Sequence, residues 1–502
     1  MKSTSIAKNT IANYIGQIYT IAIGIVMLPF YLKYLGAEAY GLVGFFTMLQ
    51  AWVILLDFGL AGTLSRETAK LKNKEDGLLE LKQLLRSVEA VYSGIVFFIV
   101  IAIYLSSSWI TSNWLSISEL STDTVVYSIQ LMGIMIGVRW FVSLYRGGII
   151  GFEYQVWLNI YNIIIATLKF VGAFLLIKYI SNDIFYFFIY QMGIALLEYL
   201  IIRHKLYSLL PNTDFLMPTI TAIKDVAPFA LSLAYTSGIW VLFTQLDKLM
   251  LSHYIPLKEY GYFTLVVLAS SIIMQLSGPL SQAILPRMTA LLSSNKELEM
   301  LKLYHYGTQL ISIIVFSLVG IITFFPYELL YAWTGDCEAS AWASPILVWY
   351  VLGNGILAIG AFQYYLQFAH GNLKYHVKMN TLFPLITLPI ILYAVINYGA
   401  MGAGVAWFMV QLIGFLVWPP FIHSKFAPGI HKDWIWKDIF PSFIMTTIFV
   451  LIMRYMHIDF TTFNRVETFL ILLLLGIILL CLNTLIYPSL RKKAFKFLRI
   501  YR

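Results

Sequence analysis

The sequence predicts an all-helical integral membrane protein with about fourteen transmembrane helices, and three observations lead to this fold class. The 502 residues are 60% hydrophobic and only 12% charged, so polar side chains are too few to cover a globular surface. Apolar runs of about 20 residues, enough for a helix to cross the roughly 30 Å hydrocarbon core, recur along the whole chain. Lys and Arg gather on one side of these runs, as in membrane proteins.

Each apolar run predicts one membrane span. The first run, residues 11–31, is too long for the core of a signal peptide and has no small-residue cleavage site after it, so we expect an uncleaved helix. The expected spans cover residues 11–33, 40–63, 87–109, 124–150, 156–178, 184–203, 226–251, 259–284, 304–332, 343–369, 378–397, 400–422, 438–456 and 467–487.

The distribution of charge predicts the orientation of these spans. If the N-terminus is inside, the basic clusters all fall on the inner side: Arg66 to Arg86, Arg203 to Lys224, Arg287 to Lys302, Lys374 and Lys378, Lys425 to Lys437, and the tail from Arg491. We therefore expect both termini in the cytoplasm, in a bacterial inner membrane. The net charge of +9 then follows from topology, and nucleic acid is not an expected partner.

A short repeat predicts the domain organisation. The segment Tyr34–Gly41 recurs as Tyr254–Gly261, with Tyr and Gly at matching ends. Each copy opens a six-helix unit, and an even number of helices gives both units the same orientation, related by a pseudo-twofold axis along the membrane normal. We expect an N-terminal lobe at 1–225 with helices 1–6, a C-terminal lobe at 226–424 with helices 7–12, and helices 13–14 with a basic cytoplasmic tail at 425–502.

The motifs of several enzyme classes are missing from the sequence. There is no Gly-Lys dipeptide, which excludes a P-loop, and no His-Glu-x-x-His metal motif. Cys337 lies near an expected outer loop and Cys481 inside the last apolar run, so a disulfide or a cysteine-based metal site is not expected. We predict a secondary transporter rather than an enzyme, with no cofactor and with protons or sodium ions as possible coupling ions.

Ionisable residues inside the expected spans are the candidate site. Each charge facing lipid would cost about 3 kcal/mol, so these residues must face protein or water. Arg139 and Arg146, like Gln191 and Glu198, are seven residues apart and share a helix face. We predict a cavity in which cations bind substrate and acids serve as coupling groups or charge partners; ion pairing between helices is the alternative. The cations are Arg139, Arg146, Lys169 and Lys248, and the acids are Asp57, Glu198 and Asp247.

Four groups of residues carry a resemblance to a known family. They are Leu28-Pro-Phe-Tyr-Leu-Lys-Tyr-Leu-Gly36 with Leu56-Asp57-Phe-Gly59; Tyr145-Arg-Gly-Gly148; Leu246-Asp247-Lys248 with Glu259-Tyr-Gly261 and Leu285-Pro-Arg287; and Tyr398-Gly-Ala-Met-Gly-Ala-Gly404. On these motifs the sequence resembles the polysaccharide and O-antigen flippases (Wzx type) of the multidrug/oligosaccharidyl-lipid/polysaccharide exporter superfamily. The resemblance covers the first twelve expected spans, while spans thirteen and fourteen match by number and position.

The resemblance implies a bundle of two six-helix lobes that moves an undecaprenyl-diphosphate-linked oligosaccharide from the inner to the outer leaflet by alternating access. It would lie in the lipid bilayer, and a polysaccharide polymerase and a chain-length regulator would be its partners. The sequence departs from this picture in one respect, because the second lobe has few charges. The alternatives are a multidrug exporter of the same fold, a membrane glycosyltransferase or polymerase, and a membrane scaffold.

Overall fold

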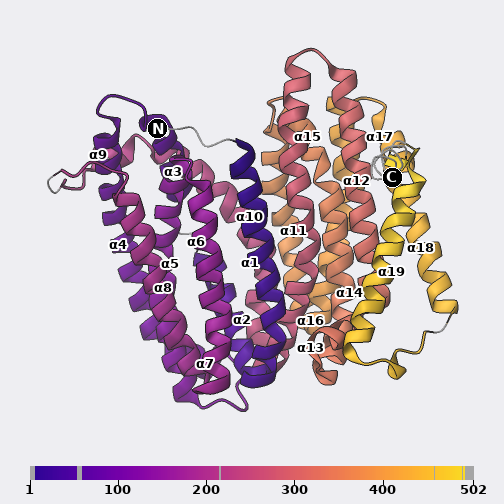
Figure 1. Ribbon diagram of the computed structural model, residues 1–502, viewed down its shortest axis with the longest axis horizontal. Coiled ribbons are helices and arrows are strands. Elements are labelled where there is room, and N and C mark those ends of the chain that lie inside the picture. Colours follow the sequence, from indigo (N-terminus) through magenta and orange to yellow (C-terminus); the bar gives the residue numbers. More distant parts are fainter. Residues whose placement is uncertain (1–5, 54–58, 214–215, 457, 489, 492–502) are drawn as a thin grey trace. The chain divides into compact units, whose positions relative to one another are not determined.

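The computed structural model describes residues 6–53, 59–213, 216–456, 458–488 and 490–491. The chain divides into two compact units, Met1–Gly261 and Tyr262–Arg502, which are described separately below. Regular structure in the described residues is helical, and the one β-type contact there is an isolated bridge between Ser116 and Pro256 (Figure 1). The expected lobe boundaries at residues 225 and 424 stay predictions, because the units are defined by contacts and the lobes by symmetry.

The helices have the following bounds. The first unit contains α1 (Ile6–Leu35), α2 (Ala37–Val53), α3 (Leu60–Leu71), α4 (Gly77–Trp109), η2 (Ile110–Trp114), α5 (Thr122–Gly151), α6 (Gln155–Thr167), η3 (Leu168–Gly172), α7 (Ala173–Tyr179), α8 (Ile184–Tyr207), α9 (Ile220–Lys224) and α10 (Ala227–Tyr254). Helix α11 (Leu257–Ser293) begins in the first unit. The second unit continues with α12 (Glu297–Phe324), α13 (Pro326–Thr334), α14 (Cys337–Gly360), α15 (Phe362–Ala369), α16 (Lys374–Phe426), α17 (Ile430–Asp433), η4 (Trp434–Ile439), α18 (Phe440–Tyr455), η5 (Phe460–Thr462) and α19 (Arg465–Ile486).

Twelve helices in the described residues are long and apolar enough to cross a membrane, which confirms the all-helical membrane fold. The count of about fourteen stays a prediction, and two places account for the difference. Helix α2 is 17 residues long and ends next to residues 54–58, which lie outside the described residues. Helix α16 is 53 residues long and has non-helical backbone at Gly399 (φ 56°, ψ −140°), between the spans expected at 378–397 and 400–422.

Helix α5 is the centre of the first unit, where it packs against α3, α4 and α8. Its apolar face is buried together with aromatic residues of the neighbouring helices. Tyr92 of α4 stacks on Trp140 of α5 with ring centroids 4.9 Å apart, and both side chains are buried. Because α5 packs against several helices, its polar side chains lie close to residues of these neighbours.

In the second unit, α18 and α19 pack against α12 (Figure 1). Their shared core is apolar and includes Phe449, Leu472 and Leu479. One buried amide crosses this core: Asn483 Nδ2 donates to Ser317 Oγ at 3.0 Å and to Thr446 Oγ1 at 3.2 Å. Polar side chains of this kind join helices in a bilayer, so α12, α18 and α19 form one packed group.

Capping residues explain where several helices begin. Asn464 accepts from the backbone N–H groups of Val466 and Glu467 at 3.0 Å, and the Glu467 carboxylate accepts from the Asn464 N–H at 2.8 Å. This capping box satisfies otherwise unpaired donors at the start of α19. Asp336 caps α14 by accepting from the Ala339 N–H at 2.9 Å. The local sequence thus sets these helix starts.

The two copies of the sequence repeat contact each other inside the first unit. A Cβ atom on Gly41 would overlap the Leu257 carbonyl oxygen and lie 3.1 Å from the Gly261 nitrogen. A Cβ atom on Gly261 would overlap the Ala37 carbonyl oxygen and lie 3.1 Å from the Gly41 nitrogen. Only glycine lets the first turns of α2 and α11 approach this closely.

The outer surface of the helices is strongly apolar. Phe98 and Leu105 on α4 are 71% and 73% exposed, and Leu385 and Ile386 on α16 are 66% and 67% exposed. Water-soluble monomers rarely expose apolar side chains in large contiguous patches. These surfaces are therefore suited to lipid, and the protein is a multi-pass membrane protein.

Candidate functional site

Arg139 lies on α5 among neutral groups. Its Nη1 donates to Gln50 Oε1 of α2 at 3.3 Å, and its Nη2 donates to Gln191 Oε1 of α8 at 3.5 Å. The guanidinium also lies over the Phe46 ring, 5.5 Å from the centroid. Amides and an aromatic face hold the guanidinium in place without cancelling its charge.

Lys169 lies in a π-helical turn, η3, between α6 and α7. A π turn breaks the regular helical hydrogen-bond ladder, and side chains of neighbouring helices bond to its carbonyl groups. Gln191 Nε2 donates to the Lys169 carbonyl at 3.0 Å, and the Tyr31 hydroxyl donates to the Phe170 carbonyl at 2.7 Å. Gln191 thus bonds to the Arg139 guanidinium and to the Lys169 backbone, and the charges of the two side chains interact.

Arg146 and Glu198 form an ion pair between α5 and α8. Arg146 Nη2 lies 3.7 Å from Glu198 Oε1, with the side chains 36% and 13% exposed. The Tyr161 hydroxyl donates to the Glu198 backbone carbonyl at 2.9 Å. The charge of Glu198 also acts on Arg139 and Lys169. These four residues, Arg139, Arg146, Lys169 and Glu198, are called the cationic cluster below.

The remaining predicted site residues are placed differently. Lys248 lies 3.2 Å from Asp247, its neighbour in the chain, and also donates to the Thr244 carbonyl. Both residues are on α10, and Asp247 is only 4% exposed. This ion pair lies within one helix and does not join two helices. Asp57 lies outside the described residues, and the functional roles of all seven residues stay predictions.

The cationic cluster carries three cations and one acid. Within the described part of the chain, no carboxylate lies at ion-pair distance from Arg139 or Lys169, whereas Arg146 has Glu198. The buried Nε of Arg139 has no hydrogen-bond partner among the described residues. Arg and Lys donors in a region of low dielectric bind phosphate and carboxylate oxygens strongly. The cluster is therefore chemically suited to an anionic group.

A second polar centre of the first unit was missed by the sequence analysis. The Glu89 carboxylate accepts from the Tyr145 and Tyr207 hydroxyl groups, each at 2.8 Å, and lies 3.5 Å from Arg86 Nη1. Glu89 lies near one end of the span expected at 87–109, and the sequence analysis did not single it out. The two tyrosines come from other helices, and no sequence spacing links them to it.

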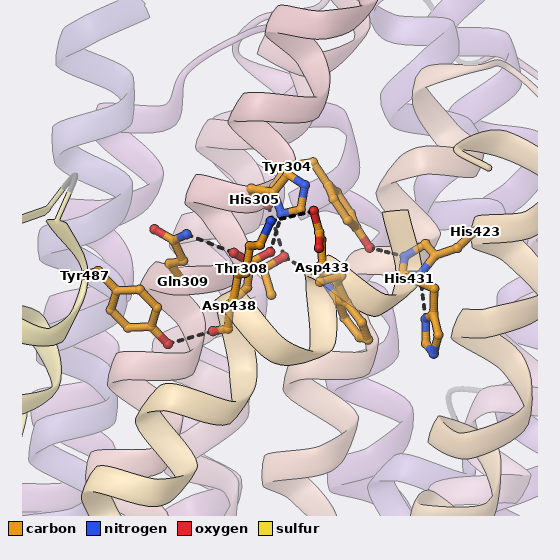
Figure 2. A network of polar contacts seen from close by, with 11 residues as sticks. Tyr304, His305, Thr308, Gln309, His423, His431, Asp433, Asp438 and Tyr487 are labelled. Carbon is orange, nitrogen blue, oxygen red and sulfur yellow. Dashed lines mark hydrogen bonds and ion pairs between the residues drawn. The ribbon is translucent and has the colours of Figure 1, made fainter. Parts of the chain in front are cut away.

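The second unit contains a network that the sequence analysis also missed (Figure 2). Asp438 of η4 contacts His305 Nδ1 of α12, and its other oxygen accepts from Gln309 Nε2 at 2.8 Å. His423 of α16 bonds to the Tyr304 hydroxyl at 2.7 Å and to His431 Nδ1 at 2.9 Å. No group of three metal-ligating side chains occurs in the described residues. The sequence did contain a signal for this network, because His305 and His423 lie at the ends of apolar runs.

A family model described as "Polysaccharide biosynthesis protein" matches residues 6–292. A search of curated proteins gives no significant match. A structure of the lipid II flippase MurJ in an inward closed conformation is 18% identical, with a TM-score of 0.71, and the match covers 96% of this chain and 98% of that one.

Two further structures have lower scores. An inward-facing MATE-family multidrug resistance transporter of the MOP superfamily is 14% identical, with a TM-score of 0.61, covering 82% of this chain and 96% of that one. A MOP superfamily transporter from Pyrococcus furiosus is 13% identical, with a TM-score of 0.56, covering 83% and 96%. At these identities the structures establish the fold alone. Together with the family match, they confirm the predicted resemblance to the exporter superfamily.

Proposed function

Because the chain belongs to the polysaccharide biosynthesis protein family, we propose that it is a flippase for a lipid-linked oligosaccharide. The substrate is an undecaprenyl-diphosphate-linked repeat unit of O-antigen or another polysaccharide. It moves by alternating access from the cytoplasmic to the periplasmic leaflet of a bacterial inner membrane, with both protein termini in the cytoplasm. A polysaccharide polymerase and a chain-length regulator are the proposed partners.

The observation that supports this substrate class is the way Arg139 and Lys169 are held. A diphosphate carries about two negative charges, and its passage through a region of low dielectric requires nearby cations. Arg139 is held by the amides of Gln50 and Gln191, so its charge stays available to an incoming anion. Arg146 is a cation already balanced by Glu198, and we propose that it attracts the head group in the same path.

Coupling to an ion gradient is part of the proposal. Glu198 would release Arg146 on protonation, which would raise the net positive charge of the cationic cluster. Asp57 is the second proposed proton acceptor, Asp247 with Lys248 is a proposed charge pair of the path, and sodium is the alternative coupling ion. Protonation during the cycle would thus strengthen the binding of an anionic head group, and loss of the proton would weaken it.

The proposal is tested with purified protein in liposomes that contain a fluorescent undecaprenyl-diphosphate oligosaccharide. The label becomes accessible to an impermeant quencher only after the lipid has crossed the bilayer. We expect transport by the wild type and by Arg139→Lys, and loss of transport in Arg139→Ala and Lys169→Ala. If a stably folded Arg139→Ala, Lys169→Ala double variant transported the lipid as well as the wild type does, the proposed cationic path would be excluded.

A gene deletion tests the same function in cells. We expect lipid-linked repeat units to accumulate on the cytoplasmic leaflet while their synthesis continues. Full-length surface polysaccharide in the deletion strain, with no second flippase present, would contradict the proposal. A multidrug exporter of the same fold would instead change resistance to cationic drugs and leave the lipid-linked units unaffected.

A further inference from the structure

Asp438 in the second unit is a buried carboxylate held by one face of α12 (Figure 2). It is 1% exposed and lies in the π-helical segment η4. One carboxylate oxygen contacts His305 Nδ1, and the other accepts from Gln309 Nε2 at 2.8 Å. His305 and Gln309 are four residues apart, so they lie one above the other on α12. A buried anion of this kind must be paired to be stable.

The counter-charge of Asp438 comes from a histidine side chain. Within the described residues, the ion pair of Asp438 is with His305, whose side chain is 28% exposed. Lys437 is the next residue in the chain, but it bonds to Asp433 at 2.7 Å and is 68% exposed. Histidine is the side chain whose ordinary pKa lies between pH 5 and 8. The charge balance of this site therefore depends on one proton.

The elements around the pair bring other polar groups to it. The titratable groups that interact with this pair or with the groups next to it include Tyr304 of α12, His423 of α16, His431, Lys432 and Asp433 of α17, Lys437 of η4, and Tyr487 after α19. The Tyr487 hydroxyl donates to the Asp438 backbone carbonyl at 2.7 Å. None of these interactions places a permanent cation against the Asp438 carboxylate in the described residues.

The same face of α12 holds the whole η4 segment. Trp434 of η4 is fully buried, and its Nε1 donates to Thr308 Oγ1 at 3.0 Å. Thr308 lies between His305 and Gln309 on α12, so three successive contacts join η4 to this helix. Only the contact between His305 and Asp438 can join two opposite charges, so its strength will vary with pH. In the other two contacts the group on α12, the Gln309 amide or the Thr308 hydroxyl, is neutral.

We propose that His305 and Asp438 form a proton-binding site that controls how tightly η4 is held against α12. With a proton on both ring nitrogens, the imidazolium and the carboxylate make a neutral pair. Loss of one proton to water through the partly exposed His305 ring leaves a neutral imidazole beside a buried anion, and η4 opens more often. The inference concerns proton binding by the protein itself and does not require the proposed substrate.

Hydrogen exchange measured by mass spectrometry tests this site with the full-length protein in lipid nanodiscs. Peptides that cover residues 434–439 are compared at pH 6 and pH 8, with labelling times scaled to equal intrinsic exchange. We expect their protection to be about tenfold lower at pH 8, as for the loss of a charged hydrogen bond. Equal protection at the two pH values would overturn the proposal.

Three variants identify the group that titrates. His305→Gln keeps a donor without the charge, and we expect the low protection of the wild type at pH 8 to appear at both pH values. Asp438→Asn removes the anion with little change of shape, so protection should no longer depend on pH. Asp433→Asn removes the exposed acid of α17 that pairs with Lys437 of η4; this variant is the matched control and should keep the wild-type pH dependence.

A further variant separates this site from the neighbouring histidine pair. His431→Gln changes the group that faces His423 and leaves His305 intact. We expect it to retain the wild-type difference between pH 6 and pH 8. If the difference disappears in His431→Gln and persists in His305→Gln, the titrating group is the His423 pair and the proposal is wrong. If His305→Gln does not fold, Asp438→Asn decides the question alone.

Discussion

Replacement of Arg146 by alanine removes the ion-pair partner of Glu198, whereas replacement of Arg139 leaves no described carboxylate without its partner. At the observed 3.7 Å, the attraction between Arg146 and Glu198 is about 4.5 kcal/mol at an effective dielectric constant of 20. Because the Arg146 side chain is 36% exposed, water reduces this value, and we expect Arg146→Ala to lower the free energy of unfolding by about 1–2 kcal/mol.

Arg139→Ala should have a smaller effect on stability. It removes two long hydrogen bonds, at 3.3 and 3.5 Å, from amides that have other possible partners. Interhelical hydrogen bonds in membrane proteins contribute on average about 0.6 kcal/mol each. We therefore expect a loss of about 1 kcal/mol or less, with normal protein abundance and little transport.

The measurement is a double-mutant cycle for Arg146 and Glu198, with unfolding followed in detergent and abundance followed by a fluorescent fusion. The double variant Arg146→Ala, Glu198→Ala should recover most of the stability that Arg146→Ala loses, because no buried charge is left without a partner. A coupling energy near zero would refute the assignment of Arg146 to an ion pair with Glu198. If Arg139→Ala lowered the free energy of unfolding as much as Arg146→Ala, the assignment of Arg139 as an available cation would also be wrong.

Three further predictions follow from the fold. Gly41→Ala and Gly261→Ala should each cost about 1–3 kcal/mol, because a Cβ must displace a facing carbonyl group, and thermal unfolding in detergent measures the loss. Asn464→Ala removes the capping box of α19 and should cost about 1 kcal/mol, whereas Asn464→Ser should cost little; a large loss with Ser would contradict the capping role. Reporter fusions test the predicted topology, and one well-expressed fusion on the wrong side would break it: we expect cytoplasmic signals at Lys72, Ser208, Lys296 and the C-terminus and periplasmic signals at Ser118 and Gly335.

The fold could be predicted from the sequence because hydropathy acts locally. A run such as residues 124–150 contains its own evidence for a membrane helix, and α5 occupies Thr122–Gly151. The apolar runs on both sides of Gly399 indicated two separate spans. They could not indicate that non-helical backbone at this one residue is all that separates the two helical parts of α16.

The candidate site could be predicted in part for a related reason. Heptad spacing placed Arg139 with Arg146 and Gln191 with Glu198 on common helix faces, but not the partner that each would contact across helices. The bond between Arg139 and Gln191 depends on how α5 packs against α8, which no local pattern records. The network around Asp438 was missed because its members on α12 lie more than 100 residues of sequence away from those on α16 and η4.

The contact between the two sequence repeats follows the rule of a symmetric dimer. In such a dimer, residue i of one copy meets residue j of the other, and residue j of the first meets residue i of the second. Gly41 meets Leu257 and Gly261 meets Ala37, and these are equivalent positions of the two repeats. One polypeptide therefore contains an interface of the kind that two separate identical chains would form. A side chain gained at either glycine would disturb both copies at once, so the two positions are expected to change together or not at all.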